Sequence, residues 1–327
     1  MAEATDFIEA FDARVERRSE RREFFRTFAG ATAIAGGLFL SHAPVAFGQT
    51  AAPTDADILN FALNLEYLEA QFYSYAATGA GLANGMLTGT GTQGTVIGGR
   101  KVNFTDPVVS QYAQEIAQDE IAHVNFLRAQ LGTSAVAQPA IDVGGTDPNG
   151  AFSKAAQAAG LVPAGTAFDP YSTDENFLLG AFIFEDVGVT AYKGAAPLIT
   201  SKVFLEAAAG ILAVEAYHAS IIRTTLYGKG IATPAPGLID ATEKISDARD
   251  SLDGPTDLDQ GVRNRAANST LVTGPASNIV PTDANALAYS RSAGQVLNIV
   301  YLNRMAVDRG GFFPAGVNGN IKTSAAN

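Results

Sequence analysis

The chain contains no cysteine and no tryptophan, and only three of its 327 residues are histidine. The absence of cysteine excludes disulfide bonds, thiolate metal sites and cysteine nucleophiles. Charged residues make up only 17 % of the chain, and the formal net charge is −11. Because phosphate binding needs clustered Lys and Arg, this acidic balance predicts no nucleic-acid partner. Apolar residues reach 47 %, so a chain of this length can bury a sizeable core.

The first fifty residues have the pattern of an export signal. Residues 20–26 read Glu-Arg-Arg-Glu-Phe-Phe-Arg, and a weakly apolar run rich in Ala and Gly extends from Phe28 to Phe47. This pattern resembles a twin-arginine signal, with small residues for cleavage near Gly48. We therefore predict that residues 1–48 engage the twin-arginine export machinery. The predicted location is periplasmic or extracellular, with a membrane-anchored form as the alternative if the signal is not cleaved.

The remainder of the chain shows helical periodicity in five segments. Apolar side chains recur every three to four positions, and capping residues precede the segments, with Gly or Pro after several of them. The predicted long helices span residues 55–77, 107–131, 173–195, 201–227 and 285–307. A short helix over 151–159 and a hairpin around 95–97 are also expected. The predicted architecture is all-α. A four-helix bundle occupies residues 49–228, with a long crossover between its second and third helices. Residues 229–327 form a loop-rich C-terminal extension that carries the fifth helix and packs on the bundle.

Both histidines outside the signal occur in the same short motif. Glu120 precedes His123 by three residues, and Glu215 precedes His218 by three residues. In an α-helix these positions lie on one face one turn apart, so a Glu and a His can bind one cation together. The competing interpretation is that both are ordinary core or surface histidines.

An internal repeat favours the metal-binding interpretation. Glu66 is followed seven residues later by Tyr73, and Glu185 is followed seven residues later by Tyr192. Seven residues are nearly two helical turns, so each Glu and Tyr lie along one line. The sequence thus predicts two helix pairs of shared design. Each pair supplies one lone Glu and one Glu-x-x-His.

The surroundings of these acids indicate a metal. Glu185 follows the apolar run 177–184, and Glu215 follows the apolar run 210–214, with no Lys or Arg in either stretch. Buried charges are normally paired or bind metals. Four carboxylates and two neutral imidazoles would balance two divalent cations. The candidate ligands are Glu66, Glu120, His123, Glu185, Glu215 and His218, with Glu120 and Glu215 expected to bridge the two metals.

Three nearby residues have competing interpretations. Glu69 lies one turn after Glu66 and is either an alternative ligand or a surface acid; the spacing to Tyr73 favours Glu66. Tyr73 and Tyr192 are either hydrogen-bond donors to the ligands, or redox-active residues, or ordinary core tyrosines.

Several other side chains are assigned structural roles. Arg128 and Arg223 each lie eight residues after a motif Glu and are expected to pair with acids at the end of the bundle. Asp119 and Asp186 adjoin ligands in sequence, so they should point away from the site towards solvent. Residues 312–313, both Phe, are expected to anchor the tail by packing.

Three stretches carry a family resemblance. They are residues 58–70 (Ile-Leu-Asn-Phe-Ala-Leu-Asn-Leu-Glu-Tyr-Leu-Glu-Ala), the two Glu-x-x-His helices, and the tail from Gly311-Phe-Phe-Pro to Asn318-Gly319. With them the chain resembles bacterial ferritin-like domain proteins of the exported, desiccation-related type, over most of residues 55–320. The resemblance implies a ferritin-like bundle with a di-metal site.

The expected cofactor is a pair of Fe ions, alternatively Mn, because mixed carboxylate and imidazole ligands suit both metals. The expected function is redox chemistry on O2 or H2O2, of the ferroxidase, peroxidase or oxidase type. The alternative is a structural envelope, stress-protection or extracellular-assembly protein, a homo-oligomer among others, whose metals are not catalytic. Iron storage in a shell is disfavoured, because the long loops and the fifth helix would obstruct compact subunit packing.

Overall fold

The computed structural model describes residues 52–235, 237–263, 265–266 and 275–327. The predicted export signal, residues 1–48, lies outside these described residues. Residues 52–327 belong to one compact unit, and the description below concerns this unit alone.

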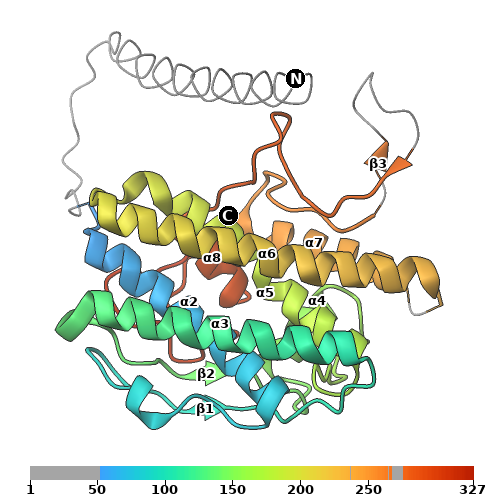
Figure 1. The fold of residues 1–327 in the computed structure, drawn as a ribbon, viewed down its shortest axis with the longest axis horizontal. Helices are drawn as coiled ribbons and strands as arrows, with labels where there is room; N and C mark the ends of the chain where they lie inside the picture. Colours follow the sequence, from blue (N-terminus) through green and yellow to red (C-terminus); the bar gives the residue numbers. More distant parts are fainter. Residues whose placement is uncertain (1–51, 236, 264, 267–274) are drawn as a thin grey trace, which may run out of the picture. The chain divides into compact units, whose positions relative to one another are not determined.

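Four long helices form a bundle (Figure 1). Their bounds are α2, Asp55–Thr78; α3, Pro107–Leu131; α5, Asp174–Ala195; and α6, Lys202–Ala232. Helix α2 packs mainly on α3, and α5 packs mainly on α6. Local chemistry sets the helix starts: Thr54 and Asp57 form a capping box before α2, and Asp106 accepts hydrogen bonds from the first turn of α3. The predicted all-α bundle is confirmed, and only the end of α6 differs, running five residues past the predicted end at 227.

The crossover between α3 and α5 is long and contains α4, Ala151–Ala158, where a short helix was predicted. Strand β1, Val96–Ile97, pairs in parallel with β2, Ile141–Asp142, so the predicted hairpin around 95–97 is wrong. The loop after α2 lies against the crossover instead of folding on itself. Glycine permits this approach: a Cβ on Gly94 would lie 2.0 Å from the backbone nitrogen of Ala140.

The C-terminal extension differs most from the prediction. It contains an additional helix, α7, Leu238–Asp253, in a stretch predicted to be irregular. The predicted helix over 285–307 shortens to α8, Ala293–Val300. It starts late, after a capping box formed by Ser292 and Gln295, and ends early, before Leu302, which has a positive φ of 52°. The remaining elements are short: β3, Arg265–Ala266, antiparallel to β4, Pro275–Ala276, and the 3₁₀ turns Asn84–Met86, Gly132–Ser134 and Ala196–Leu198.

Apolar and aromatic packing attaches the extension to the bundle. Helix α8 contacts α5 and α7. Phe312 and Phe313 are fully buried, and the Phe312 ring packs on Phe152 and Phe184 with centroids 5.1 and 4.9 Å apart. The predicted role of these two phenylalanines as packing anchors is confirmed.

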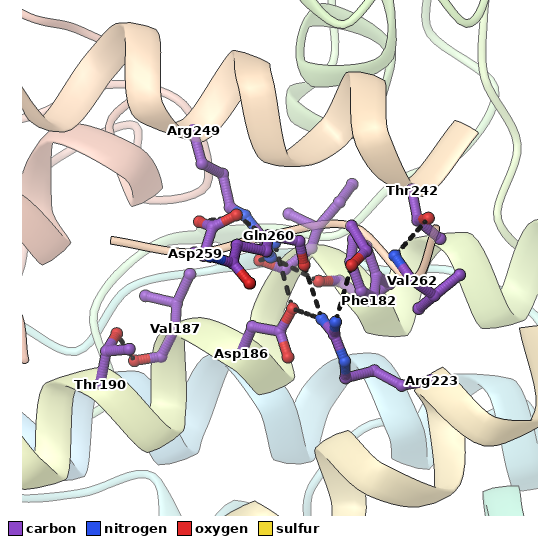
Figure 2. Close-up of polar contacts among 12 residues, drawn as sticks. Phe182, Asp186, Val187, Thr190, Arg223, Thr242, Arg249, Asp259, Gln260 and Val262 are labelled. Carbon is purple, nitrogen blue, oxygen red and sulfur yellow. Dashed lines mark hydrogen bonds and ion pairs between the residues drawn. The ribbon is translucent and has the colours of Figure 1, made fainter. Parts of the chain in front are cut away.

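A buried ionic network makes the second attachment. Arg223 on α6 and Arg249 on α7 both reach Asp186 on α5, at 2.7 and 3.2 Å (Figure 2). Asp259 binds Arg249 at 3.0 Å and Arg291 at 2.6 Å. Arg291 also binds Asp253 at 2.5 Å, and all six side chains are buried.

This network corrects two predictions. Asp186 was expected to face solvent, but it is only 4 % exposed because the extension covers its side of α5. Arg223 pairs with an acid, as expected. Arg128 does not: its guanidinium donates to the Tyr67 hydroxyl and the Thr88 carbonyl, both at 2.6 Å.

Helix α6 is, within the described residues, long and apolar enough to cross a membrane by length and composition alone. In this structure it is a bundle helix that carries the buried side chains of Glu215, His218 and Arg223.

Candidate metal centre

All six predicted ligands meet inside the bundle, and all six are buried. Each of the four helices contributes: α2 and α5 supply one Glu each, and α3 and α6 supply one Glu-x-x-His each. The ligand atoms form two overlapping groups, with all atoms of a group within 4.8 Å of one another. The first group is Glu66, Glu120, His123 and Glu215; the second group is Glu120, Glu185 and His218.

Glu120 belongs to both groups, and its two oxygens face different histidines. Glu120 Oε2 lies 3.6 Å from His123 Nδ1, and Glu120 Oε1 lies 3.0 Å from His218 Nδ1. The two imidazole centroids are 6.2 Å apart. Glu120 thus lies between the two histidines, where its predicted bridging role would place it.

The other carboxylates are divided between the two groups. His123 Nδ1 lies 3.1 Å from Glu66 and 3.8 Å from Glu215. His218 Nδ1 lies 3.7 Å from Glu185. Glu215 therefore belongs to the His123 group alone, and the bridging role predicted for it stays a prediction.

The two tyrosines contact ligands across the bundle. Tyr73 on α2 donates a hydrogen bond to Glu185 on α5, and Tyr192 on α5 donates to Glu66 on α2. The sequence aligned each tyrosine with the glutamate of its own helix, whereas the structure exchanges the partners. Each hydroxyl therefore fixes the orientation of a carboxylate on the opposite helix pair.

Without a cation, burial and mutual repulsion dominate the carboxylates. Burial, together with the charge of Glu120, raises the pKa of Glu66 to about 7. Burial is also the main reason that the pKa of Glu185 rises to about 8. Burial opposes ionisation of Glu120 too, but its contacts with the two histidines outweigh burial and lower its pKa to about 2.

The histidines shift in the complementary direction. Burial lowers their pKa values, but contacts with carboxylates outweigh burial. Glu120 and Glu66 raise the pKa of His123 to about 11, and Glu120 and Glu185 raise the pKa of His218 to about 9. Protons therefore occupy the positions where cations would neutralise the carboxylates.

The donor atoms fit a pair of metal ions. Both oxygens of Glu215 and Glu185 Oε2 are buried without a hydrogen-bond partner, and the 3.0 Å contact between Glu120 Oε1 and His218 Nδ1 does not have hydrogen-bond geometry. Buried polar atoms are normally satisfied, so this group of lone-pair donors indicates a missing positive partner. Carboxylate oxygens with imidazole nitrogens are ligands for Fe, Mn and Zn.

Two acids near the cluster need a correction. Glu69 is only 5 % exposed, which excludes a surface acid, and it belongs to neither ligand group. Burial and the neighbouring carboxylates raise its pKa well above the usual value. Asp119 faces solvent in part, as predicted, but it does not point away from the site: its Oδ2 lies 3.1 Å from His218 Nε2. The sequence could predict that a metal-binding histidine has a partner for its second nitrogen, but not that Asp119 of another helix supplies it.

A bundle with one Glu from each of two helices and Glu-x-x-His from each of the other two defines the class of ferritin-like carboxylate proteins. Comparison with known proteins agrees: the family model described as "Ferritin-like domain" matches residues 54–228. The chain belongs to this ferritin-like domain family.

Two relatives extend the similarity beyond the bundle. The desiccation-related protein PCC13-62 of Craterostigma plantagineum is 31 % identical over 277 residues, which cover 81 % of this chain and 83 % of that protein. The ferritin-like catalase Nec2 of Nesocodon mauritianus is 29 % identical over 280 residues, covering 82 % and 84 %. No solved structure shows a significant match.

Proposed function

We propose that this protein is an exported oxidoreductase that binds two Fe or Mn ions and disproportionates hydrogen peroxide into water and O2. The observation that carries the proposal is the pair of ligand groups that share Glu120 and leave buried lone pairs unsatisfied. Similarity to a ferritin-like catalase favours peroxide as the substrate over O2 alone. Two redox-active ions in this site would supply reversible two-electron chemistry.

The chain's own residues would bind the two ions and fix the orientation of the ligands. Glu120 would bridge the two ions. The other carboxylates and the histidine Nδ1 atoms would complete each position, while Tyr73 and Tyr192 keep Glu185 and Glu66 in place. Burial and the neighbouring carboxylates raise the pKa of Glu69 well above its usual value, which favours the neutral form of this fifth acid. Four ionised carboxylates then balance two divalent cations.

The overall reaction balances within the substrate. One H2O2 accepts two electrons and two protons and gives two H2O. A second H2O2 releases two electrons and two protons and gives O2. No external reductant is needed, which suits a site enclosed in an exported protein.

The test uses the chain without its predicted signal (residues 49–327), loaded with Mn(II) or Fe(II). We expect about two metal ions per chain by elemental analysis, and O2 release from H2O2 at an oxygen electrode. Glu120→Gln should lose both the bound metal and the O2 release, because it removes the charge of the carboxylate that the two ligand groups share. Glu115→Gln is the matched control, since Glu115 lies on the exposed side of the same helix and should leave both unchanged. Fewer than one metal ion per chain in the unmodified protein would refute the di-metal proposal.

The second candidate function is structural, as part of a stress-protection or assembly protein. Similarity to a desiccation-related protein supports it, and so does the large extension that is attached through a buried ionic network. It predicts two bound ions without O2 release from H2O2 and without rapid O2 uptake on adding Fe(II). A protein that oxidises Fe(II) but does not disproportionate peroxide would give rapid O2 uptake on adding Fe(II) and no O2 release from H2O2.

Export is part of the proposal and is supported by the Arg21-Arg22 pair and the weak apolar run that follows it. In a bacterial host with an active twin-arginine pathway, the full chain should reach the periplasm. Changing both arginines to lysine should retain it in the cytoplasm. Equal periplasmic recovery of both proteins would argue against this route.

A further inference from the structure

The two histidines differ in what their second ring nitrogen contacts. Nδ1 of His218 faces the cluster, while its Nε2 lies 3.1 Å from Asp119 Oδ2. Asp119 is on α3, its side chain is 43 % exposed, and it reaches across to α6. For His123, Nδ1 also faces the cluster, but Nε2 has no hydrogen-bond partner in the described part of the chain.

The internal repeat shows why one partner is missing. Asp119 comes directly before Glu120 in the first Glu-x-x-His, and Val214 comes directly before Glu215 in the second. Val214 therefore occupies on α6 the position that Asp119 occupies on α3. Valine can accept no hydrogen bond, so the repeat is broken at this one position.

The number of carboxylates also differs between the two groups, and it is larger in the group whose histidine lacks an outer acid. The His123 group contains three of them, including Glu215, whereas the His218 group contains only two. The group with fewer carboxylates is thus the one whose histidine is held by an outer acid. An outer carboxylate fixes the tautomer and orientation of a metal-binding imidazole and increases its basicity.

We infer that Asp119 is a positioning residue that strengthens the cation position at His218 and makes the two positions chemically distinct. The His123 position gains affinity from a third carboxylate. The His218 position gains it from an imidazole whose Nε2–H donates to Asp119, which leaves the Nδ1 lone pair directed at the cation. This inference rests on the proposed metal binding, and concerns how that affinity is distributed between the two positions.

The test is a titration of the metal-free chain, without its predicted signal, with Mn(II). Calorimetry measures the two binding steps, and electron paramagnetic resonance monitors the Mn(II) pair. In Asp119→Ala we expect one of the two binding steps to weaken about 10- to 100-fold, while the other stays unchanged. At intermediate Mn(II) the spin-coupled pair signal should give way to that of a single Mn(II). Asp119→Asn keeps an acceptor oxygen without the charge, so it should weaken the same step less.

Two controls separate positioning from a general structural role. Glu115→Ala removes an exposed acid of the same helix and should change neither step. Val214→Asp supplies the missing partner and should tighten the step that Asp119→Ala leaves unchanged.

The outcomes distinguish this inference from the proposed function. Unmodified protein that binds no Mn(II) would refute the metal proposal, and this inference with it. Two normal binding steps in Asp119→Ala would overturn this inference alone, as would equal weakening of both steps.

Discussion

Two clusters of buried ionisable side chains meet at adjacent residues of α5, and they differ in charge balance. Asp186 belongs to the ionic network, in which three arginines face three aspartates, so the charges cancel. Glu185 belongs to the metal cluster, in which four carboxylates, when ionised, outnumber the two histidines even if both histidines carry a proton. The comparison teaches that burial of charge alone does not indicate a cofactor. Burial of an unbalanced charge does.

The pKa shifts express the same difference. In the ionic network, burial opposes ionisation of Asp259, but Arg249 and Arg291 outweigh burial and lower its pKa. In the metal cluster, burial raises the pKa values of Glu66 and Glu185. No arginine or lysine is among the groups that shift these two pKa values. In the first cluster every aspartate has an arginine partner in the chain, although burial still raises the pKa of Asp253. The second cluster requires protons or cations.

The largest effect should come from unbalancing the ionic network. Arg291→Met leaves the buried Asp253 without its arginine partner and leaves Asp259 with Arg249 alone. Removing one member of a buried ion pair typically costs about 3–5 kcal/mol, so the free energy of unfolding in urea should fall by that amount. Arg263→Met is the matched control, because its pair with Asp240 is exposed in the same extension and should matter little. Equal losses in both variants would contradict the role of the network.

A smaller effect of opposite sign should follow from removing a charge in the metal cluster. Glu185→Gln keeps an acceptor for Tyr73 but removes a carboxylate whose pKa is raised to about 8 by burial. With EDTA at pH 6 the variant should therefore be more stable than the unmodified chain by about 2 kcal/mol, because pH 6 lies 1.5 units above the ordinary pKa of 4.5. With saturating Mn(II) the order should reverse, because the variant lacks a ligand. A variant that is less stable under both conditions would break the comparison.

Counted for one proton over one pH unit, the smallest effect should be the pH dependence of the stability of the metal-free protein. Folded Glu66 and Glu185 keep protons up to about pH 7 and 8, whereas the unfolded chain releases them near its ordinary pKa of 4.5. Folded His123 and His218 likewise keep protons above 6.5, with pKa values near 11 and 9. The folded state binds more protons, so its stability should fall as pH rises from 5 to 8, by about 1.4 kcal/mol per pH unit for each extra proton.

Urea unfolding at pH 5.5, 6.5 and 7.5 in EDTA measures this slope. Saturating Mn(II) should remove or reverse it, because cations and protons compete for the same ligands. The Glu185→Gln variant should show a shallower slope in EDTA. A metal-free protein that becomes more stable over this range would contradict the assignment of the protons.

The four bundle helices were predictable because their signals are local. Thr54 and Asp106 cap α2 and α3, and apolar periodicity runs through each segment. Helix α7 was missed because Gly237, the residue before it, provides no side-chain cap and the helix sequence is largely polar. The β1–β2 pairing was missed because it joins segments that are distant in sequence, where no local turn signal exists.

The sequence by itself determined four of the six candidate ligands, because the i and i+3 geometry of a helix places Glu120 beside His123, and Glu215 beside His218, whatever surrounds them. It indicated Glu66 and Glu185 through their shared spacing to a tyrosine. Only the tertiary structure decided the contacts between helices. It exchanged the tyrosine partners, placed Asp119 on His218, and buried Asp186 against arginines. Helical spacing fixes neighbours along one helix, whereas packing angle and register, set by the whole core, fix neighbours across helices.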